Sequence, residues 1–246
     1  MILVTNDDGI HSKGIIVLVK ALQEIGNIFV VAPDSEQSAV AHSLTLHRPL
    51  RVDKIKKNFY AVDGTPADCI HLGVNALLPK RPRLIVSGIN KGGNLADDII
   101  YSGTVSAAFE GTLLGIPSFA ISLVSRSHFR FDVAARFALR VARYIMRQGL
   151  PRNTFLNINV PNLEEKEIKS YKITQQGKLI HDGGGVIEKV DPRGRKYYWI
   201  GGGEMIFDKG RNTDVEAISK SHISITPLSL DLTNHSSIRE LKKWRI

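Results

Sequence analysis

The first 160 residues alternate between short apolar runs and segments of helical spacing, and this alternation most limits the fold. Apolar, β-rich runs predict buried strands at 2–5, 28–32, 84–87, 118–122 and 154–160. Between them, helical spacing predicts helices at about 15–25, 67–78, 104–114 and 132–148. Strands that alternate with helices form a parallel sheet covered on both faces. We therefore predict an α/β fold over 1–160, an open, doubly wound and mostly parallel sheet of the Rossmann-like kind.

Residues 161–246 have a different pattern. Short strand-like pieces at 171–174, 196–200 and 222–228 are separated by loops rich in glycine and charged residues. A final amphipathic segment ends in LKKWRI at 241–246. We predict a β-rich extension with a C-terminal helix, and extensions of this kind often form the contact between subunits.

Charge and cysteine content narrow the class of protein. The formal net charge of +9 favours anionic partners, but the basic residues are scattered, so an ordinary solvated surface explains them equally well. A single cysteine, Cys69, excludes an intrachain disulfide and favours a reducing, cytoplasmic compartment. No secretory leader pattern precedes the first strand, and no apolar run approaches the ~20 residues that span a bilayer.

Polar residues follow three of the predicted strands, where ligands bind in an open α/β sheet. They are Asn6, Asp7, Asp8 and Gly9 after the first strand, 34–38 after the second, and Ser87, Asn90 and Asn94 at the third. Adjacent carboxylates repel, and burying them costs several kcal/mol without compensation. Oxygen donors suit Mg²⁺, Mn²⁺ or Ca²⁺. A solvated turn with Gly9 at positive φ is the alternative for the aspartates alone, but the neighbouring polar loops favour a metal.

Two further stretches stand at predicted helix starts. GTPADC at 64–69 has the spacing of a capping box, and we interpret it as structural. YSGTVSAAFEG at 101–111 places two hydroxyls around a glycine, where free N–H groups hold phosphate. We therefore predict a phosphate site at Ser102, Gly103 and Thr104.

The remaining reactive residues and motifs do not point to a further functional site. Cys69 has no metal-ligand spacing and is predicted to lie in the core. His11, His42 and His47 are possible acid–base groups, although an isolated histidine is more often structural. The chain has no glycine-rich dinucleotide fingerprint, no P-loop and no nucleophile elbow.

Several motifs together resemble those of the SurE survival-protein family. In order, they are TNDDG, VVAPDSEQS, GTPADC, SGINKGGN and YSGTVSAAFEG, with SITPLSLDLT near the C-terminus. The resemblance covers roughly residues 1–233. One departure is Gly93, which stands where the family usually has proline, and it removes no proposed ligand.

The resemblance implies a metal-dependent phosphomonoesterase, a nucleotidase that hydrolyses nucleoside 5′-monophosphates, and 3′-monophosphates, by a metal-activated water. It implies one divalent ion, Mg²⁺ or Mn²⁺, held by Asp7, Asp8, Ser38 and Asn90. Of these, Asp7, Asp8 and Asn90 are the expected catalytic residues, with Asp8 as candidate general base. Phosphate is expected at Asn94, Ser102, Gly103 and Thr104. A homodimer or homotetramer through the C-terminal region is also implied, without membrane or nucleic-acid partners.

Three other functions stay open from the residues. A haloacid-dehalogenase-type phosphatase would use Asp7 as a covalent nucleophile, but that chemistry usually has D-x-D where this chain has adjacent aspartates. A nucleic-acid binder would explain the net charge and predicts steeply salt-dependent binding. A nucleotide sensor would bind the same ligand without turnover.

Overall fold

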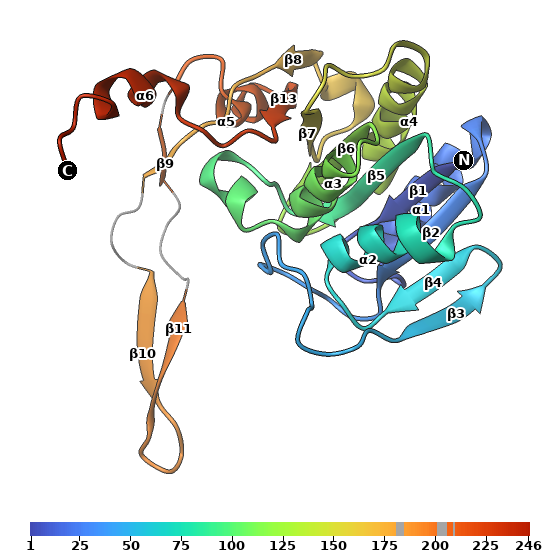
Figure 1. The fold of residues 1–246 in the computed structure, drawn as a ribbon, viewed down its shortest axis with the longest axis horizontal. Helices are drawn as coiled ribbons and strands as arrows, with labels where there is room; N and C mark the ends of the chain where they lie inside the picture. Colours follow the sequence, from blue (N-terminus) through green and yellow to red (C-terminus); the bar gives the residue numbers. More distant parts are fainter. Residues whose placement is uncertain (181–184, 201–205, 209) are drawn as a thin grey trace.

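The structure is a computed structural model that describes residues 1–180, 185–200, 206–208 and 210–246 (Figure 1). Within those residues, its centre is a nine-stranded sheet of order β3-β4-β2-β1-β5-β6-β7-β13-β8. The strands from β4 to β7 in this order run parallel. Their bounds are β1 (Ile2–Thr5), β2 (Ile28–Pro33), β4 (Phe59–Val62), β5 (Leu84–Lys91), β6 (Ser118–Val124) and β7 (Thr154–Pro161). The predicted open, mostly parallel α/β sheet is confirmed.

The two edges of the sheet depart from the parallel pattern. At one edge, β3 (Val52–Lys56) forms an antiparallel hairpin with β4. At the other, β13 (Ile223–Ser229) pairs antiparallel with β7, and β8 (Tyr171–Ile173) adds parallel to β13. Two strands from the predicted extension therefore complete the central sheet, so residue 160 is not a boundary of the sheet. A functional division between 1–160 and 161–246 stays a prediction.

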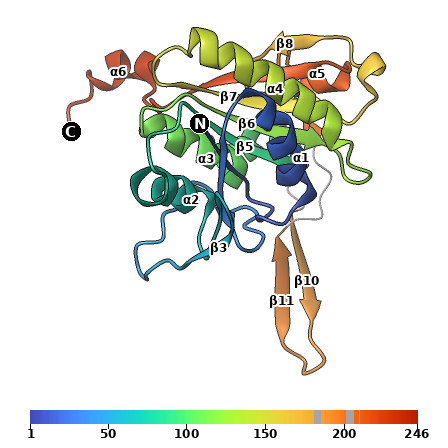
Figure 2. The same ribbon diagram turned by 90° about the vertical axis from the view of Figure 1, so that its right-hand side faces the viewer.

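Helices cover both faces of the sheet (Figures 1 and 2). Helices α1 (Lys13–Leu22) and α4 (Phe131–Gln148) pack together, and α2 (Pro66–Leu72) packs against α3 (Gly103–Leu113). Because side chains alternate along a strand, Ile2 and Val4 share a core with α1 and α4, whereas Leu3 shares one with α2. Cys69 belongs to the second core and is fully buried, as predicted.

Short helical turns connect these elements. The predicted helix ending near residue 25 is split into α1 and a 3₁₀ turn (Gln23–Ile25). The one predicted at 67–78 is split into α2 and a π-helical segment (Gly73–Leu77). Thr65 and Asp68 form the predicted capping box at the start of α2. Two more 3₁₀ turns are η3 (Ala96–Ile100) and η4 (Glu165–Glu167).

The C-terminal part carries an arm that projects from the body of the molecule (Figures 1 and 2). The arm begins with β9 (Leu179–Ile180) paired to β12 (Ile206–Phe207) and continues as the hairpin of β10 (Val186–Val190) and β11 (Lys196–Ile200). Helix α5 (Asp214–Ser219) precedes β13, and the predicted terminal helix is α6 (His235–Leu241). In the described residues, no helix has the length and apolar character needed to cross a membrane.

Candidate active site

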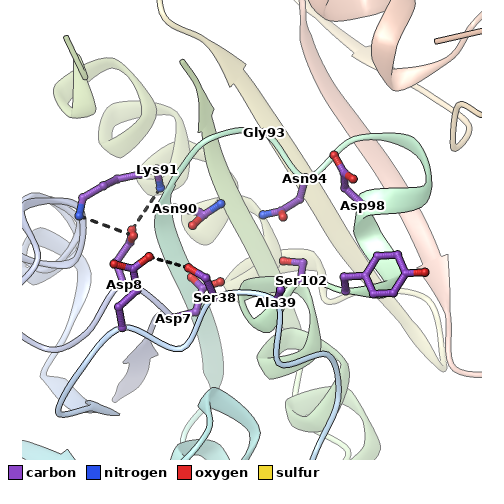
Figure 3. A pocket seen from close by; sticks show the side chains of 12 residues that line it. Asp7, Asp8, Ser38, Ala39, Asn90, Lys91, Gly93, Asn94, Asp98 and Ser102 are labelled. Atoms are coloured by element: carbon purple, nitrogen blue, oxygen red, sulfur yellow. Dashed lines mark hydrogen bonds and ion pairs between the residues drawn. The ribbon is translucent and has the colours of Figure 1, made fainter. Parts of the chain in front are cut away.

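The candidate site lies where the strand order reverses. The chain passes from β1 to β2 on one side and later to β5 on the other, which opens a crevice at the carboxyl ends of β1 and β5. Loops after β1, β2 and β5, together with the start of α3, line a cavity of about 310 Å³ there (Figure 3). Its lining residues are Asp7, Asp8, Glu36, Ser38, Ala39, Asn90, Lys91, Gly93, Asn94, Asp98, Tyr101 and Ser102.

The turn after β1 holds the two aspartates in place. Gly9 has a φ of 89°, the left-handed conformation expected for the turn. The amide of Asn6 donates to the Gly9 carbonyl at 2.9 Å and to the Ser12 hydroxyl at 2.8 Å. The turn that was the alternative explanation for the aspartates is thus present, and it directs both of them to the cavity.

Asp7 is buried at the base of the cavity and is held by the start of α3. The Thr104 hydroxyl donates to Asp7 Oδ1 at 2.5 Å, and the Thr104 N–H donates to Oδ2 at 3.1 Å. Burial raises the pKa of the Asp7 carboxyl to about 6; the charge on Asp8 adds to this rise and the Thr104 hydroxyl opposes it. The two groups that hydrogen-bond to Asp7 are both neutral, so a bound cation would stabilise its ionised carboxylate.

Gly103 allows this close approach of α3 to the turn. A Cβ at residue 103 would lie 3.0 Å from the Cβ of Asp7 and 3.2 Å from Cγ of Pro66. Neither Gly103 nor Thr104 lines the cavity, and both proton donors of Thr104 are engaged by Asp7. A phosphate bound at Thr104 would need its N–H or its hydroxyl as a donor. In the structure both donors are bound to Asp7 instead.

Asp8 is paired with Lys91, which was not among the predicted site residues. The Lys91 N–H donates to Asp8 Oδ2 at 3.1 Å, and the Lys91 ammonium lies 3.6 Å from Oδ1. Burial raises the pKa of the Asp8 carboxyl, and the charge on Lys91 opposes that rise. Lys91 directly follows Asn90 in SGINKGGN, so its place beside a predicted ligand was the available signal.

The two neutral metal-ligand candidates come from the loops after β2 and from β5. Ser38 is exposed, and its hydroxyl donates to Glu36 Oε1 at 2.7 Å. Asn90 lies just past a β-bulge between Gly88 and Asn90, which turns the strand end, and its amide donates to the Gly92 carbonyl at 3.0 Å. Both residues line the cavity with Asp7 and Asp8, so the structure brings the four predicted ligands together (Figure 3).

Asn94 and Ser102 form the part of the cavity beyond Asn90. The Asn94 N–H donates to Asn159 Oδ1 at 2.8 Å, and its amide donates to the Ser122 hydroxyl at 2.8 Å. Ser102 caps α3 and accepts a hydrogen bond from the Val105 N–H at 3.1 Å. These two predicted phosphate residues line the cavity, and their side chains are held in place by buried partners.

The loop that carries Ser38 is tied to α2 and α3 through two carboxylates. His42 Nε2 lies 2.9 Å from Glu110 Oε2, and the opposite oxygen of Glu110 lies 3.0 Å from His71 Nδ1. Asp68 accepts from the N–H and hydroxyl of Thr45 at 2.9 and 2.6 Å. The hydrogen bond with His42 lowers the pKa of the Glu110 carboxyl, against the effect of burial, and the one with His71 lowers it further.

Of the three histidines considered as acid–base groups, His42 thus serves to hold the loop. His11 and His47 are exposed and do not line the cavity. In the same loop, Ala39 and Ala41 have φ values of 56° and 52°, which L-residues adopt at a cost and only where their surroundings hold them. The loop after β2 is therefore a wall of the cavity that is tied to α2 and α3 by hydrogen bonds.

The chemistry of the donor set fits a hard divalent cation. Carboxylate, hydroxyl and amide oxygens come together, with adjacent buried carboxylates that such an ion would stabilise. Across the described part of the chain, no group of three or more His, Cys, Asp or Glu side chains is arranged to hold a metal. A cation here would therefore combine two carboxylates with neutral oxygens and water.

Fold and site together define a doubly wound α/β protein with an acidic, oxygen-lined cavity at the topological switch point of its sheet. The family model for survival protein SurE matches residues 2–182. The chain belongs to the SurE family, which confirms the resemblance seen in its motifs.

Curated relatives and a solved structure agree with this assignment. The chain is 54% identical over 244 residues to the 5′-nucleotidase SurE of Geobacter sulfurreducens, an alignment of 99% of this chain and 93% of that protein. It is 55% identical to the 5′-nucleotidase SurE of Pelobacter propionicus, over 99% and 98% of the two chains. The crystal structure of the SurE protein from Aquifex aeolicus superposes with a TM-score of 0.87 at 44% identity, covering 98% of each chain.

Proposed function

We propose that this protein is a 5′-nucleotidase, a metal-dependent phosphomonoesterase that converts nucleoside 5′-monophosphates to nucleoside and phosphate. Membership of the SurE family and the names of its curated relatives support hydrolysis of nucleoside monophosphates. The observation that carries the proposal is the pair of adjacent aspartates, Asp7 buried and Asp8 half-buried, in an oxygen-lined cavity at the switch point. Activity on 3′-monophosphates belongs to the same proposal, because the roles it gives to residues concern the metal, the attacking water and the phosphate group, which both kinds of monophosphate share.

In this proposal, Asp7, Asp8, Ser38 and Asn90 hold one Mg²⁺ or Mn²⁺ ion. The bound ion would supply Lewis acidity at a phosphoryl oxygen and a lowered pKa for an attacking water. Asp7 contributes mainly charge and position, since both of its oxygens already accept hydrogen bonds from Thr104. A covalent-nucleophile role for Asp7 is disfavoured by the sequence, which has adjacent aspartates where that chemistry usually has D-x-D.

Asp8 is the general base in this scheme. Its carboxylate lies beside Lys91, whose positive charge favours the ionised form that burial disfavours. An ionised carboxylate on the cavity wall accepts a proton from the attacking water. Lys91 has the further role of attracting the substrate dianion to this side of the cavity.

In this proposal the phosphate group is held by Asn94 and Ser102, which line the same cavity as the four candidate metal ligands. Their side chains are positioned by Ser122 and by the start of α3, so they need little reorganisation when charge spreads over the phosphoryl oxygens. Gly103 and Thr104 act behind them by holding Asp7 in place.

The proposal includes a homodimer or homotetramer formed through the C-terminal region. The β10–β11 hairpin projects from the body (Figure 1). Apolar side chains on both of its strands are exposed. Tyr198 and Trp199 are among them, and such residues are enriched in interfaces. The proposal also includes a cytoplasmic location, because the single cysteine is free and suits a reducing compartment.

Phosphate release from AMP tests the enzymatic proposal. The protein is assayed with Mg²⁺, Mn²⁺ or EDTA, as wild type, as Asp8→Asn and as the matched surface control Asp53→Asn, which alters an exposed carboxylate on β3. We expect release with metal, none in EDTA, and a loss of about 100-fold or more in kcat for Asp8→Asn only. Release that persists in EDTA would overturn the role of the metal, and bound but intact AMP would favour a sensor.

A further inference from the structure

One aromatic side chain, that of Tyr101, lines the candidate active-site cavity. Tyr101 leaves 62% of its surface accessible, although it stands between η3 and the buried start of α3. The other residues that line this cavity are charged, amide, hydroxyl or small side chains. Other tyrosines of this chain are equally exposed, so it is the place of Tyr101 in the cavity wall, together with its exposure, that makes its ring available to a ligand.

The backbone of Tyr101 is fixed although its ring is accessible. Its N–H donates to the Asp98 carbonyl at 3.1 Å, and its carbonyl accepts from the Ala41 N–H at 3.0 Å. The second bond joins it to the loop after β2, which is itself tied to α2 and α3. A ring on a fixed backbone presents a flat apolar face at a small entropic cost, which suits recognition by stacking.

The polar groups of the cavity follow one another from one side to the other, and Tyr101 adjoins one of them in the chain. Figure 3 shows Asp8 and Lys91 on one side of the cavity, Asp98 on the other, and Asn94 and Ser102 between them. Ser102 directly follows Tyr101 in the chain. Because Asn94, Ser102 and Tyr101 line the same cavity, a substrate whose phosphate is held at Asn94 and Ser102 has the Tyr101 ring in the wall around it.

We propose that Tyr101 is the platform on which the nucleobase of the substrate stacks; this inference rests on the proposed nucleotidase function and specifies how that site recognises its substrate. A ring face binds every base, because each base has a π surface, and it reads no hydrogen-bonding edge. The site therefore favours nucleotides over other phosphomonoesters and discriminates weakly among bases, with larger purines ahead of pyrimidines.

The test compares substrates with and without a base. Hydrolysis of AMP, UMP and ribose 5-phosphate is measured for the wild type, Tyr101→Ala, Tyr101→Phe and the control Tyr144→Ala, which removes an equally exposed tyrosine on α4. For Tyr101→Ala we expect KM for AMP to rise about 5-fold or more, with a smaller rise for UMP and unchanged values for ribose 5-phosphate. Tyr101→Phe and Tyr144→Ala are expected to behave as wild type.

The outcomes separate this inference from the proposed function. Equal changes for AMP and ribose 5-phosphate in Tyr101→Ala, or no change for either, would overturn the stacking role while leaving the nucleotidase intact. If the wild type hydrolyses no nucleotide, the proposed function fails, and calorimetric binding of AMP and ribose 5-phosphate in EDTA decides the stacking role alone. A preference for AMP that Tyr101→Ala loses and Tyr101→Phe keeps would support stacking, and a preference that Tyr101→Ala keeps would refute it.

Discussion

Replacement of Thr104 by valine removes one defined interaction from the base of the site. Valine keeps the shape of threonine and the backbone N–H bond to Asp7 Oδ2, but it loses the hydroxyl that donates to Oδ1. Hydrogen bonds to charged groups contribute about 1.5–3 kcal/mol, and Asp7 is only 6% exposed, so water is poorly placed to replace the hydroxyl. We expect Thr104→Val to lower the free energy of unfolding by about 1.5–3 kcal/mol.

For a chain of this size, that loss corresponds to a fall of about 3–12 °C in Tm. Differential scanning calorimetry and urea unfolding in EDTA measure it, with Thr104→Ser as the matched control. Serine keeps the hydroxyl and loses one methyl group, which is expected to cost about 1 kcal/mol. If Thr104→Val is no less stable than Thr104→Ser, the hydroxyl does not hold Asp7 and the description of the site base is wrong.

Two further predictions concern the loop after β2 and the projecting arm. The hydrogen bond with His42 lowers the pKa of Glu110 in the folded protein below the unfolded-state value near 4.5. The ionised Glu110 carboxylate therefore stabilises the fold above pH 4.5, and this stabilisation is lost as the pH falls through the lower folded-state pKa. The stability difference between wild type and Glu110→Gln, measured by urea unfolding, is therefore expected to be constant from pH 5.5 to 5 and to shrink below about 4.5; a difference that grows below pH 4.5 would contradict this. Trp199 is 62% exposed at the arm, so Trp199→Glu is expected to lower the solution mass measured by light scattering, whereas Tyr144→Glu on α4 leaves it unchanged. An unaltered mass for Trp199→Glu would remove β11 from the subunit contact.

Much of the fold was predictable because the parallel strands are buried on both faces. In β1 and β6 nearly every residue is apolar or buried, so the runs stand out from the polar loops around them. The β3–β4 hairpin was missed because β3 is mostly exposed and carries a polar sequence, VDKIK, without a buried face. The incorporation of β8 and β13 into the main sheet depends on pairing across more than 50 residues, which local patterns do not encode.

The site was predictable to the extent that strand ends converge at one edge of a parallel sheet. That rule brought Asp7, Asp8 and Asn90 together from the sequence alone. It did not reveal that Thr104 bonds to Asp7, since the two residues are 97 positions apart and α3 first has to dock on the turn. The role of Glu110 was likewise invisible, because its histidine partners come from a separate loop and a separate helix.

The most direct test of the proposed metal site is to locate the metal. Crystals of the wild-type protein grown with Mn²⁺ would be measured at the manganese absorption edge, with Asp8→Asn crystals as the control. A single anomalous peak among Asp7, Asp8, Ser38 and Asn90, weakened or absent in the variant, is the predicted result. A peak elsewhere, or none from a protein that hydrolyses AMP in the same solution, would contradict the assignment of these four residues as the metal site.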